Sequence, residues 1–261
     1  MMILKFNQLN ENKMWYKTIT EMLEWIELKS KIPNIYVDVE TTGLAGPKQE
    51  QLTQISAITS NYDFITNSFN EISLFDEKIK LTQQLKDRYA KPDDTTRRIL
   101  SFNHYGSGNY KYKDEKQIVE DFFNWINEHS PCLLVAQNAI FDMKMLGGRF
   151  GDKITNEVFD TKMLIQLYFL PLIQKLSETD RLYQEMVKKI GTSPRDNGLI
   201  SSSMGKIGPA LGLDMTGYHD AISDVRITMK MFQKIVELLK EYKDVDIRKY
   251  QTERIKSIRS K

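Results

Sequence analysis

Hydrophobic and polar positions along the chain follow helix-like and strand-like periods in turn. Near the N-terminus, Thr18 and Glu21 form a capping box and apolar residues then recur at helical spacing, which predicts a helix over 18–31. Segments rich in β-branched residues follow and are predicted to be strands: 35–40, 52–59 and 64–72. Asn61 and Asp63 favour a turn between the last two. The first third of the chain therefore predicts a helix and then a strand meander.

The remainder of the chain alternates helical patterns with two short apolar runs. Helices are predicted at 77–90, 94–102, 115–128, 139–149, 161–169 and 178–190, and strands at 132–136 and 157–159. Two stretches are predicted to be loops: 103–114 and 191–208. A long final helix is predicted to begin near Asp220, with an apolar stripe from Val225 to Leu239. Strands that alternate with helices, without internal repeats, predict one α/β domain.

The composition removes several classes of protein. Of 261 residues, 41% are hydrophobic and 28% are charged, which excludes a disordered or collagen-like chain. The single cysteine, Cys132, lies in an apolar run and is interpreted as a small buried hydrophobe. The longest largely apolar stretch, 163–173, is shorter than the roughly 20 residues of a membrane span. Since 1–10 has no signal-like pattern either, we expect a cytoplasmic protein with no membrane partner.

Charge is divided unevenly along the chain. The whole sequence carries a formal net charge of +2, whereas 243–261 holds seven basic and three acidic residues and sums to +4, which leaves −2 for the rest. We divide the chain into a single domain at 1–242, which includes the N-terminal helix, and a basic C-terminal extension at 243–261. The extension fits a polyanionic partner, although a solvated terminal helix has the same pattern.

Two acids stand two positions apart in the first predicted strand. Residues two apart in a strand point to the same side, so Asp38 and Glu40 would place two carboxylates next to each other. Carboxylates that close repel, and one of them would stay protonated unless a cation neutralised the pair. A solvated strand face with alternating acids is the other interpretation, but Ile35, Val37 and Val39 indicate a central strand. The pair therefore predicts a divalent-metal site.

Another acid follows the apolar strand at 132–136. Asn138 is a natural N-cap for the next helix, and Asp142 then lies one turn inside it, on the same side as Asn138. This spacing aims Asp142 toward the carboxyl end of the strand. An acid that only suits the helix dipole fits the same position, so this cluster alone leaves both interpretations open.

The third cluster opens the last long helix with His219, Asp220 and Asp224. Five residues of helix rotate by about 140°, so His219 and Asp224 cannot share a face if both are helical. With His219 on the preceding loop and Asp224 one turn inside the helix, both side chains can face one pocket. Asp220 is interpreted as the N-cap rather than as a ligand.

Taken in order, the clusters read D-x-E-T-T-G-L from Asp38, N-A-x-F-D from Asn138 and H-x-A-x-x-D from His219. They resemble the three exonuclease motifs of the DnaQ-like, DEDDh family of 3′-to-5′ exonucleases, and the resemblance spans about 35–239. Asp160 and the residues after it also resemble the D-T-x-x-L segment of that family. The resemblance implies a ribonuclease H-like α/β fold, with a mixed sheet of an antiparallel meander and parallel strands, flanked by helices.

The resemblance also implies roles for individual residues. The residues that would bind two divalent cations, Mg²⁺ or Mn²⁺, are Asp38, Glu40, Asp142 and Asp224. His219 would be the general base that takes the proton of the attacking water. Substrate contacts would come from Thr41, Thr42, Leu44, Asn138 and Phe141. Gln137 stands where many relatives have His, which puts no metal ligand in doubt.

The expected activity is a metal-dependent 3′-to-5′ exonuclease that releases nucleoside monophosphates from single-stranded ends, with DNA slightly preferred over RNA. An oligoribonuclease or RNA-trimming exonuclease is the alternative enzyme, because a contact to the 2′-hydroxyl cannot be read from the sequence. The expected partner is nucleic acid with a free 3′ end, and a polymerase or replication partner also fits. The alternative of another class is an inactive nucleic-acid-binding or polymerase-associated module. Such a module would lack a carboxylate or the histidine, and all five residues are present.

Overall fold

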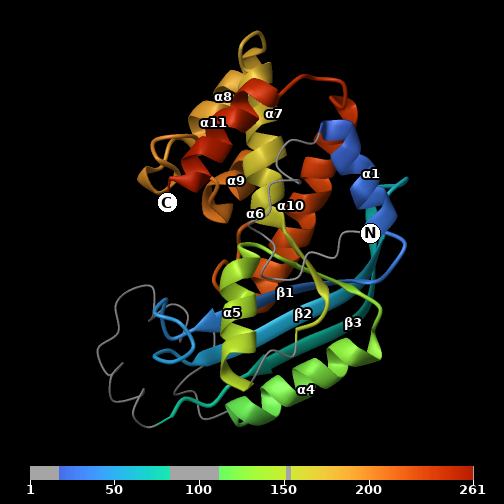
Figure 1. Ribbon diagram of the computed structural model, residues 1–261, viewed down its shortest axis with the longest axis vertical. Coiled ribbons are helices and arrows are strands. Elements are labelled where there is room, and N and C mark those ends of the chain that lie inside the picture. The colour runs from blue at the N-terminus through green and yellow to red at the C-terminus, as the bar shows by residue number, and fades with distance from the viewer. Residues whose placement is uncertain (1–17, 83–111, 151–153, 261) are drawn as a thin grey trace.

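The structure, a computed structural model, describes residues 18–82, 112–150 and 154–260 (Figure 1). The strands are β1 (Asn34–Thr41), β2 (Leu52–Asp63), β3 (Ser68–Lys78), β4 (Leu133–Ala136) and β5 (Glu157–Asp160). The α-helices are α1 (Ile19–Lys29), α4 (Glu115–Glu128), α5 (Ala139–Phe150), α6 (Thr161–Leu164), α7 (Leu170–Leu176), α8 (Arg181–Ile190), α9 (Met204–Ala210), α10 (Ala221–Glu241) and α11 (Arg248–Arg259). The helix predicted at 94–102 and most of the loop predicted at 103–114 lie outside the described residues.

One mixed sheet has the strand order β3-β2-β1-β4-β5. β1 pairs antiparallel with β2, and β2 pairs antiparallel with β3, which makes the predicted meander. On its other side β1 pairs parallel with β4, and β4 pairs parallel with β5. The prediction of a mixed α/β sheet with a central first strand is therefore confirmed.

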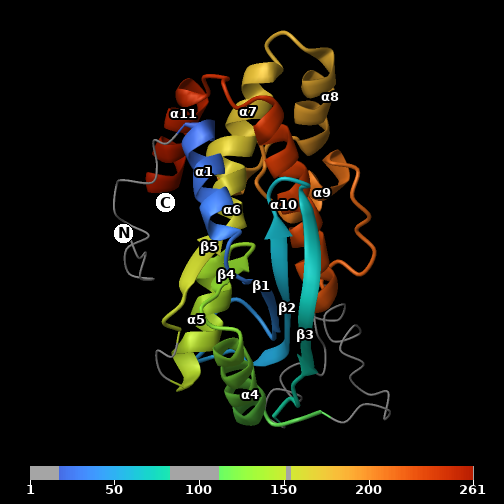
Figure 2. The same cartoon turned by 90° about the vertical axis from the view of Figure 1, so that its right-hand side faces the viewer.

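Side-chain alternation along β1 separates two cores. Ile35, Val37 and Val39 belong to the core that α4 and α5 complete. Tyr36 belongs to the other core, which contains side chains from α1 and α10. Because residues two apart point to the same side, Asp38 and Glu40 continue the Tyr36 side of the strand. Figures 1 and 2 show α10 and α4 on opposite sides of the sheet.

The β2–β3 hairpin lies further along the chain than predicted. β2 continues to Asp63 and β3 covers Ser68–Lys78, so the bounds of the strand predicted at 64–72 and the start of the helix predicted at 77–90 are wrong. Glu and Lys are favourable in helices, which explains the error, but the backbone pairing of β3 with β2 outweighs that preference. Residues 83–90 of the predicted helix lie outside the described part.

The turn of this hairpin uses one of the two residues predicted for it. Asn61 lies within β2, but Oδ1 of Asp63 accepts the N–H groups of Ile65 and Thr66 at 2.8 and 3.0 Å. Asn67 then has a φ of 54°, in the left-handed region that asparagine tolerates. The turn therefore follows Asp63 instead of preceding it.

Other helix bounds also differ from the prediction. The helix expected at 161–169 continues through a π-helical segment, η2 (Ile165–Phe169), into α7. Pro171 does not end it, because the π-helical segment shifts the hydrogen-bond pattern and the proline falls in the first turn of α7. The helix expected from 178 begins after the N-cap Asp180. The loop expected at 191–208 contains a 3₁₀ turn, η3 (Pro194–Asp196), and most of α9.

The basic C-terminal segment forms a helix that packs against the body. α11 contacts α7 and η2, and its buried side chains are Tyr250, Gln251, Arg254 and Ile255. Lys249, Lys256 and Arg259 are exposed. α11 is therefore amphipathic, with one face buried against the body and a charged face exposed to solvent. The division of the chain at residue 242 stays a prediction.

None of the helices in the described ranges combines the length and the apolar character that a bilayer crossing requires.

Candidate active site

The central strand carries the first two acids. Asp38 and Glu40 lie on the same side of β1, in register with Ser56 and Gln54 of β2. The side chain of Glu40 is buried and that of Asp38 is half-buried. β1 is a central strand of the sheet, and β2 pairs with it beside both acids, whereas the pairing with β4 on the other side stops at Tyr36.

Asp142 reaches the same strand from the first turn of α5. β4 pairs with β1 only as far as Tyr36 and Val135, after which the chain turns into α5. Beyond that point, the N–H of Val39 donates to Oδ1 of Asp142 at 3.2 Å. This hydrogen bond holds the Asp142 carboxylate against the backbone between Asp38 and Glu40. The spacing predicted that Asp142 points to the carboxyl end of the strand at 132–136, and the contact that the structure shows is with the neighbouring strand β1.

The start of α5 is supported by Asp160, at the end of β5. Its Oδ1 accepts the N–H of Asn138 at 3.0 Å and that of Lys162 at 2.9 Å. Asn138 has a φ of 71°, and its own Oδ1 accepts from Nζ of Lys162 at 2.9 Å. The predicted N-cap role of the Asn138 side chain is therefore wrong, because its left-handed backbone departs from the extended conformation of an N-cap. The carboxylate that stabilises this helix start comes from a separate strand.

His219 and Asp224 meet at the start of α10. The N–H of His219 donates to both carboxylate oxygens of Asp224, each at 3.3 Å. His219 precedes the helix with a φ of 78°, and Gly217 has a φ of 82° in the same turn. The ring of His219 lies 4.0 Å from that of Tyr218, tilted by 31°, which restricts the direction of the imidazole. The histidine is thus outside the helix and the aspartate one turn inside it, as the spacing predicted.

The strand acids and the third cluster converge on one place. Ligand atoms of Glu40, His219 and Asp224 all lie within 4.8 Å of one another. Asp142 lies close to Asp38, and of the neighbouring charges it raises the pKa of Asp38 the most. Five side chains from β1, α5 and the start of α10 therefore share one electrostatic environment.

Burial and repulsion together raise the pKa values of these acids. Loss of hydration is the largest cause at each position, and it raises the pKa of Asp142 to about 8 and that of Asp224 to about 7. The pKa values of Asp38 and Glu40 rise well above the usual carboxyl range, with further contributions from the neighbouring acids. The N–H groups of Val39 and His219 act in the opposite direction, since each stabilises the carboxylate it binds.

This set of donors fits a hard divalent cation. Carboxylate oxygens are the ligands that Mg²⁺ and Mn²⁺ prefer, and a bound cation would remove the repulsion that raises the pKa values. The residues that could hold such cations are Asp38, Glu40, Asp142 and Asp224, and His219 lies beside Glu40 and Asp224. Without a cation, the acids cannot all ionise near neutral pH at no cost.

The loop after β1 is held in shape by its own hydroxyl groups. Oγ1 of Thr42 donates to Oε2 of Glu50 at 2.7 Å, and Oγ1 of Thr41 donates to the carbonyl oxygen of Gly43 at 2.8 Å. Both threonines are buried, whereas Leu44 is 82% exposed. The loop therefore presents an apolar side chain to solvent while its hydroxyl groups serve its own geometry.

The remaining predicted contact residues lie beside Asp142. Asn138 and Phe141 are both half-buried at the start of α5. Phe141 packs partly on the core that α4 and α5 share. Asn138 binds Lys162 through its side chain. The substrate-contact role of both residues stays a prediction.

Two buried polar residues were missed by sequence reasoning. Gln54 bonds to the start of α10, and Glu50 accepts from Thr42. A long polar side chain within the predicted strand at 52–59 was a usable signal for Gln54, because such side chains are rarely buried without a partner. Glu50 lies in a loop and gave no periodic signal.

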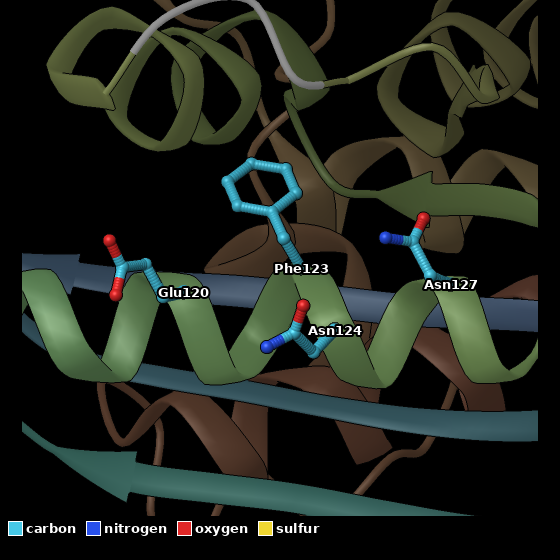
Figure 3. Close-up of a pocket in the computed structure, with 4 residues that line it drawn as sticks. All are labelled: Glu120, Phe123, Asn124 and Asn127. Carbon is cyan, nitrogen blue, oxygen red and sulfur yellow. The ribbon is translucent and has the colours of Figure 1, made fainter.

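A separate hollow lies along α4. It is lined by Glu120, Phe123, Asn124 and Asn127 (Figure 3). None of the predicted site residues is among these four, and they include a single acid. The chemistry therefore belongs to the acid cluster at β1 and not to this hollow.

A comparison with known families decides the class of the chain. The exonuclease family model, RNase_T, matches residues 35–232, which include all three clusters. The chain belongs to this exonuclease family. The predicted resemblance to exonucleases and the expectation of a phosphodiester hydrolase are thereby confirmed. No curated protein matches the sequence.

Solved structures of exonuclease I share the fold of this exonuclease. One exonuclease I structure is 14% identical, with a TM-score of 0.51, over 81% of this chain and 44% of that chain. E. coli exonuclease I in complex with a dA16 oligonucleotide is 18% identical, with a TM-score of 0.56, over 81% and 42%. The zinc-bound complex of E. coli exonuclease I with single-stranded DNA is 16% identical, with a TM-score of 0.54, over 81% and 42%. This chain spans less than half the length of those proteins, and the likeness confirms the predicted ribonuclease H-like fold.

Proposed function

We propose that the chain is a metal-dependent 3′-to-5′ exonuclease that releases nucleoside monophosphates from single-stranded ends, with DNA slightly preferred over RNA. The observation that carries the proposal is the convergence of Glu40, His219 and Asp224, with Asp38 and Asp142 in reach of the same charges. Membership of the exonuclease family supports phosphodiester hydrolysis. The oligonucleotides in the E. coli exonuclease I structures support a single-stranded substrate.

The carboxylates of Asp38, Glu40, Asp142 and Asp224 would hold two Mg²⁺ or Mn²⁺ ions. Bound there, the ions would stabilise the negative charge on the attacking and leaving oxygens of an in-line displacement. The protein contributes the placement of the ligands: two acids come from a central strand, and one comes from each of two helix starts. Hydrogen bonds from backbone N–H groups hold Asp142 and Asp224 in position.

His219 takes the proton of the attacking water in this proposal. Its backbone is tied to Asp224 and its ring lies on that of Tyr218, so the imidazole has a defined direction beside the acids. A general base must be unprotonated to act, and imidazole meets this condition near neutral pH.

The loop from Thr41 to Leu44 and the start of α5 take the terminal nucleotide. Leu44 offers an exposed apolar side chain against which a base can pack, and the bonds of Thr41 and Thr42 fix the loop that presents it. In this proposal Asn138 and Phe141, both half-buried at the start of α5, also contact that nucleotide. A polymerase or replication partner and a cytoplasmic location stay predictions.

The test is digestion of 5′-labelled single-stranded and duplex oligomers of one sequence, as DNA and as RNA, with Mg²⁺, Mn²⁺ or EDTA. The expected result is a ladder that shortens from the 3′ end, fastest on single-stranded DNA and absent with EDTA or with Asp38→Ala. Faster digestion of RNA would favour the RNA-trimming alternative. Binding without cleavage would favour the inactive module, and release of the 5′ label as a mononucleotide would overturn the polarity.

A further inference from the structure

Gln54 connects the sheet to the start of the helix that carries Asp224. Its side chain is fully buried on β2, directly opposite Glu40 of β1. Its Oε1 accepts the N–H of Ala221, the first residue of α10, at 3.2 Å. Its Nε2 donates to Oδ1 of Asp220 at 3.1 Å and to Oδ1 of Asp76 at 2.9 Å. The amide thus has both its acceptor and its donor group engaged.

These contacts give the start of α10 a hydrogen-bond partner that its N-cap residue does not provide. Asp220 occupies the N-cap position of α10, but its side chain makes no capping hydrogen bond. The first N–H groups of a helix have no partner within the helix, so a buried one must find a partner elsewhere. Gln54 supplies that partner for Ala221. The sheet, and not the local sequence, therefore fixes where α10 begins.

The position of this helix start sets the position of the proposed metal ligands. Ala221 follows His219 by two residues, and Asp224 lies one turn further into α10. Gln54 is in register with Glu40, so one side chain ties the strand pair β1 and β2 to the element that bears His219 and Asp224. A shift of the helix start would change the separation of Glu40 from Asp224, which is now within 4.8 Å.

The amide group suits this place better than a carboxylate would. An amide can both accept and donate hydrogen bonds, and here its NH₂ group donates to two acids at once. Asp220 already raises the pKa values of Asp38, Glu40 and Asp224 through its charge. Glu at position 54 would add a third acid to Asp76 and Asp220 and would lose both donors. The identity of the residue as Gln is therefore part of the arrangement.

We infer that Gln54 is a positioning residue that sets the distance between the acids of β1 and the start of α10. It touches neither substrate nor metal, and it acts through Ala221 and Asp220. The inference rests on the proposed function, because it assigns Gln54 to the alignment of that same metal site. Residues of this kind, which orient the groups that bind a metal, typically change metal affinity by about 10- to 100-fold when they are replaced.

The test compares Mn²⁺ affinity, measured by calorimetry on the full chain, with kcat and KM on a single-stranded oligonucleotide. Gln54→Leu removes all three hydrogen bonds, and Gln54→Glu keeps the acceptor while it replaces the donors with a charge. We expect Mn²⁺ affinity to fall about 10- to 100-fold in both variants. We also expect kcat to fall with little change in KM. Gln54→Glu with Asp220→Asn should recover part of the loss, because the bond between positions 54 and 220 is restored with donor and acceptor exchanged, whereas the bond to Asp76 stays lost.

Gln166→Leu is the matched control. Gln166 is also buried, and its Nε2 donates to Ser202 at 3.0 Å and to Asp196 at 3.3 Å, among residues outside the proposed site. Its replacement should lower the melting temperature but leave Mn²⁺ affinity within about threefold. Position 54 variants that melt earlier yet keep wild-type Mn²⁺ affinity would overturn the inference, as would a double variant with no recovery. A wild-type chain that binds Mn²⁺ but cleaves no nucleic acid would sink the proposed function, and the affinity comparison would still decide the role of Gln54.

Discussion

The N–H of Val39 donates to the carboxylate of Asp142 at 3.2 Å, across 103 positions of sequence. The bond exists because β4 ends before β1 does, so the last part of β1 meets the first turn of α5 instead of another strand. The acid from α5 is thereby brought beside the two acids of β1. The cluster of acids thus depends on β4 being shorter than β1, because the end of β1 that has no pairing with β4 leaves room for Asp142.

Removal of Asp38 should separate catalysis from folding. We expect Asp38→Ala to lower the cleavage rate by several orders of magnitude, because it removes a proposed metal ligand. The metal-free protein should melt no earlier than wild type, since the substitution relieves repulsion from Asp142 and its neighbours. Glu24→Gln, which removes an exposed acid from α1, is the control and should leave both quantities unchanged. Cleavage by Asp38→Ala within tenfold of wild type would contradict the site.

The raised pKa values predict that metal-free stability falls as pH rises. Carboxyl groups of the unfolded chain have pKa values of about 4. In the folded protein the pKa of Asp224 is about 7 and that of Asp142 is about 8. Between these values the native state binds more protons than the unfolded state, so the free energy of unfolding decreases with pH. Urea midpoints measured with EDTA from pH 5 to 8 should therefore decline.

Added Mn²⁺ should reverse this trend, because it binds the ionised acids and releases their protons. The gain in urea midpoint should be larger at pH 8 than at pH 5. Asp142→Asn with Asp224→Asn should flatten the decline in EDTA, since two of the titrating groups are gone. A metal-free midpoint that rises steadily over this range would show that the acids are not held in a desolvated, mutually repelling cluster.

The loop after β1 predicts a steric coupling between Gly43 and Glu50. A Cβ at position 43 would lie 2.8 Å from the Glu50 carboxyl group, which cannot move freely because it accepts from Thr42. We expect Gly43→Ala to raise KM for an oligonucleotide several-fold by displacing the segment that carries Leu44. Glu50→Asp shortens the opposing side chain, so the double variant should bind substrate better than Gly43→Ala alone. Equal KM values for the single and double variants would argue against the coupling.

The basic C-terminal segment should be tested by charge removal and not by truncation. Deletion of α11 would expose side chains that are now buried, such as Ile255, and should lower the melting temperature. Lys249→Gln, Lys256→Gln and Arg259→Gln change only exposed positions. If the segment contacts phosphates, the triple variant should flatten the salt dependence of oligonucleotide affinity by about one unit of slope for each lost contact. An unchanged slope would show that these charges make no phosphate contact.

The sequence predicted the local positions of the acids well because period and spacing are local properties. The alternation of Ile35, Val37 and Val39 with Asp38 and Glu40 identified a central strand, and the β1 register agrees. The contacts of Gln54 with α10 could not be predicted from the sequence, since they depend on which strand lies beside which helix. The same holds for Asp160, whose carboxylate supports a helix start on another element. Such long-range hydrogen bonds leave no periodic trace in one sequence.

The last prediction concerns His219 as the proposed base. If neutral imidazole accepts the proton, the single-turnover rate should rise with pH and then level once His219 is deprotonated. His219→Ala should lose about 100-fold or more in the chemical step, which is the size expected for one acid-base group. It should also lose the acidic limb of the profile, whereas a limb set by the carboxylates or by the bound metal would remain.

Metal affinity distinguishes this role from that of a ligand. The ring of His219 lies within 4.8 Å of ligand atoms of Glu40 and Asp224, so the geometry alone suits either role. A base contributes nothing to ground-state metal binding, so the Mn²⁺ dissociation constant of His219→Ala should stay within about threefold of wild type. The bonds that fix Asp224 come from the backbone of His219 and survive the substitution. If His219→Ala loses Mn²⁺ affinity in proportion to its cleavage rate, His219 is a metal ligand. If the variant keeps both the rate and the acidic limb of the pH profile, His219 has no part in the proton transfer.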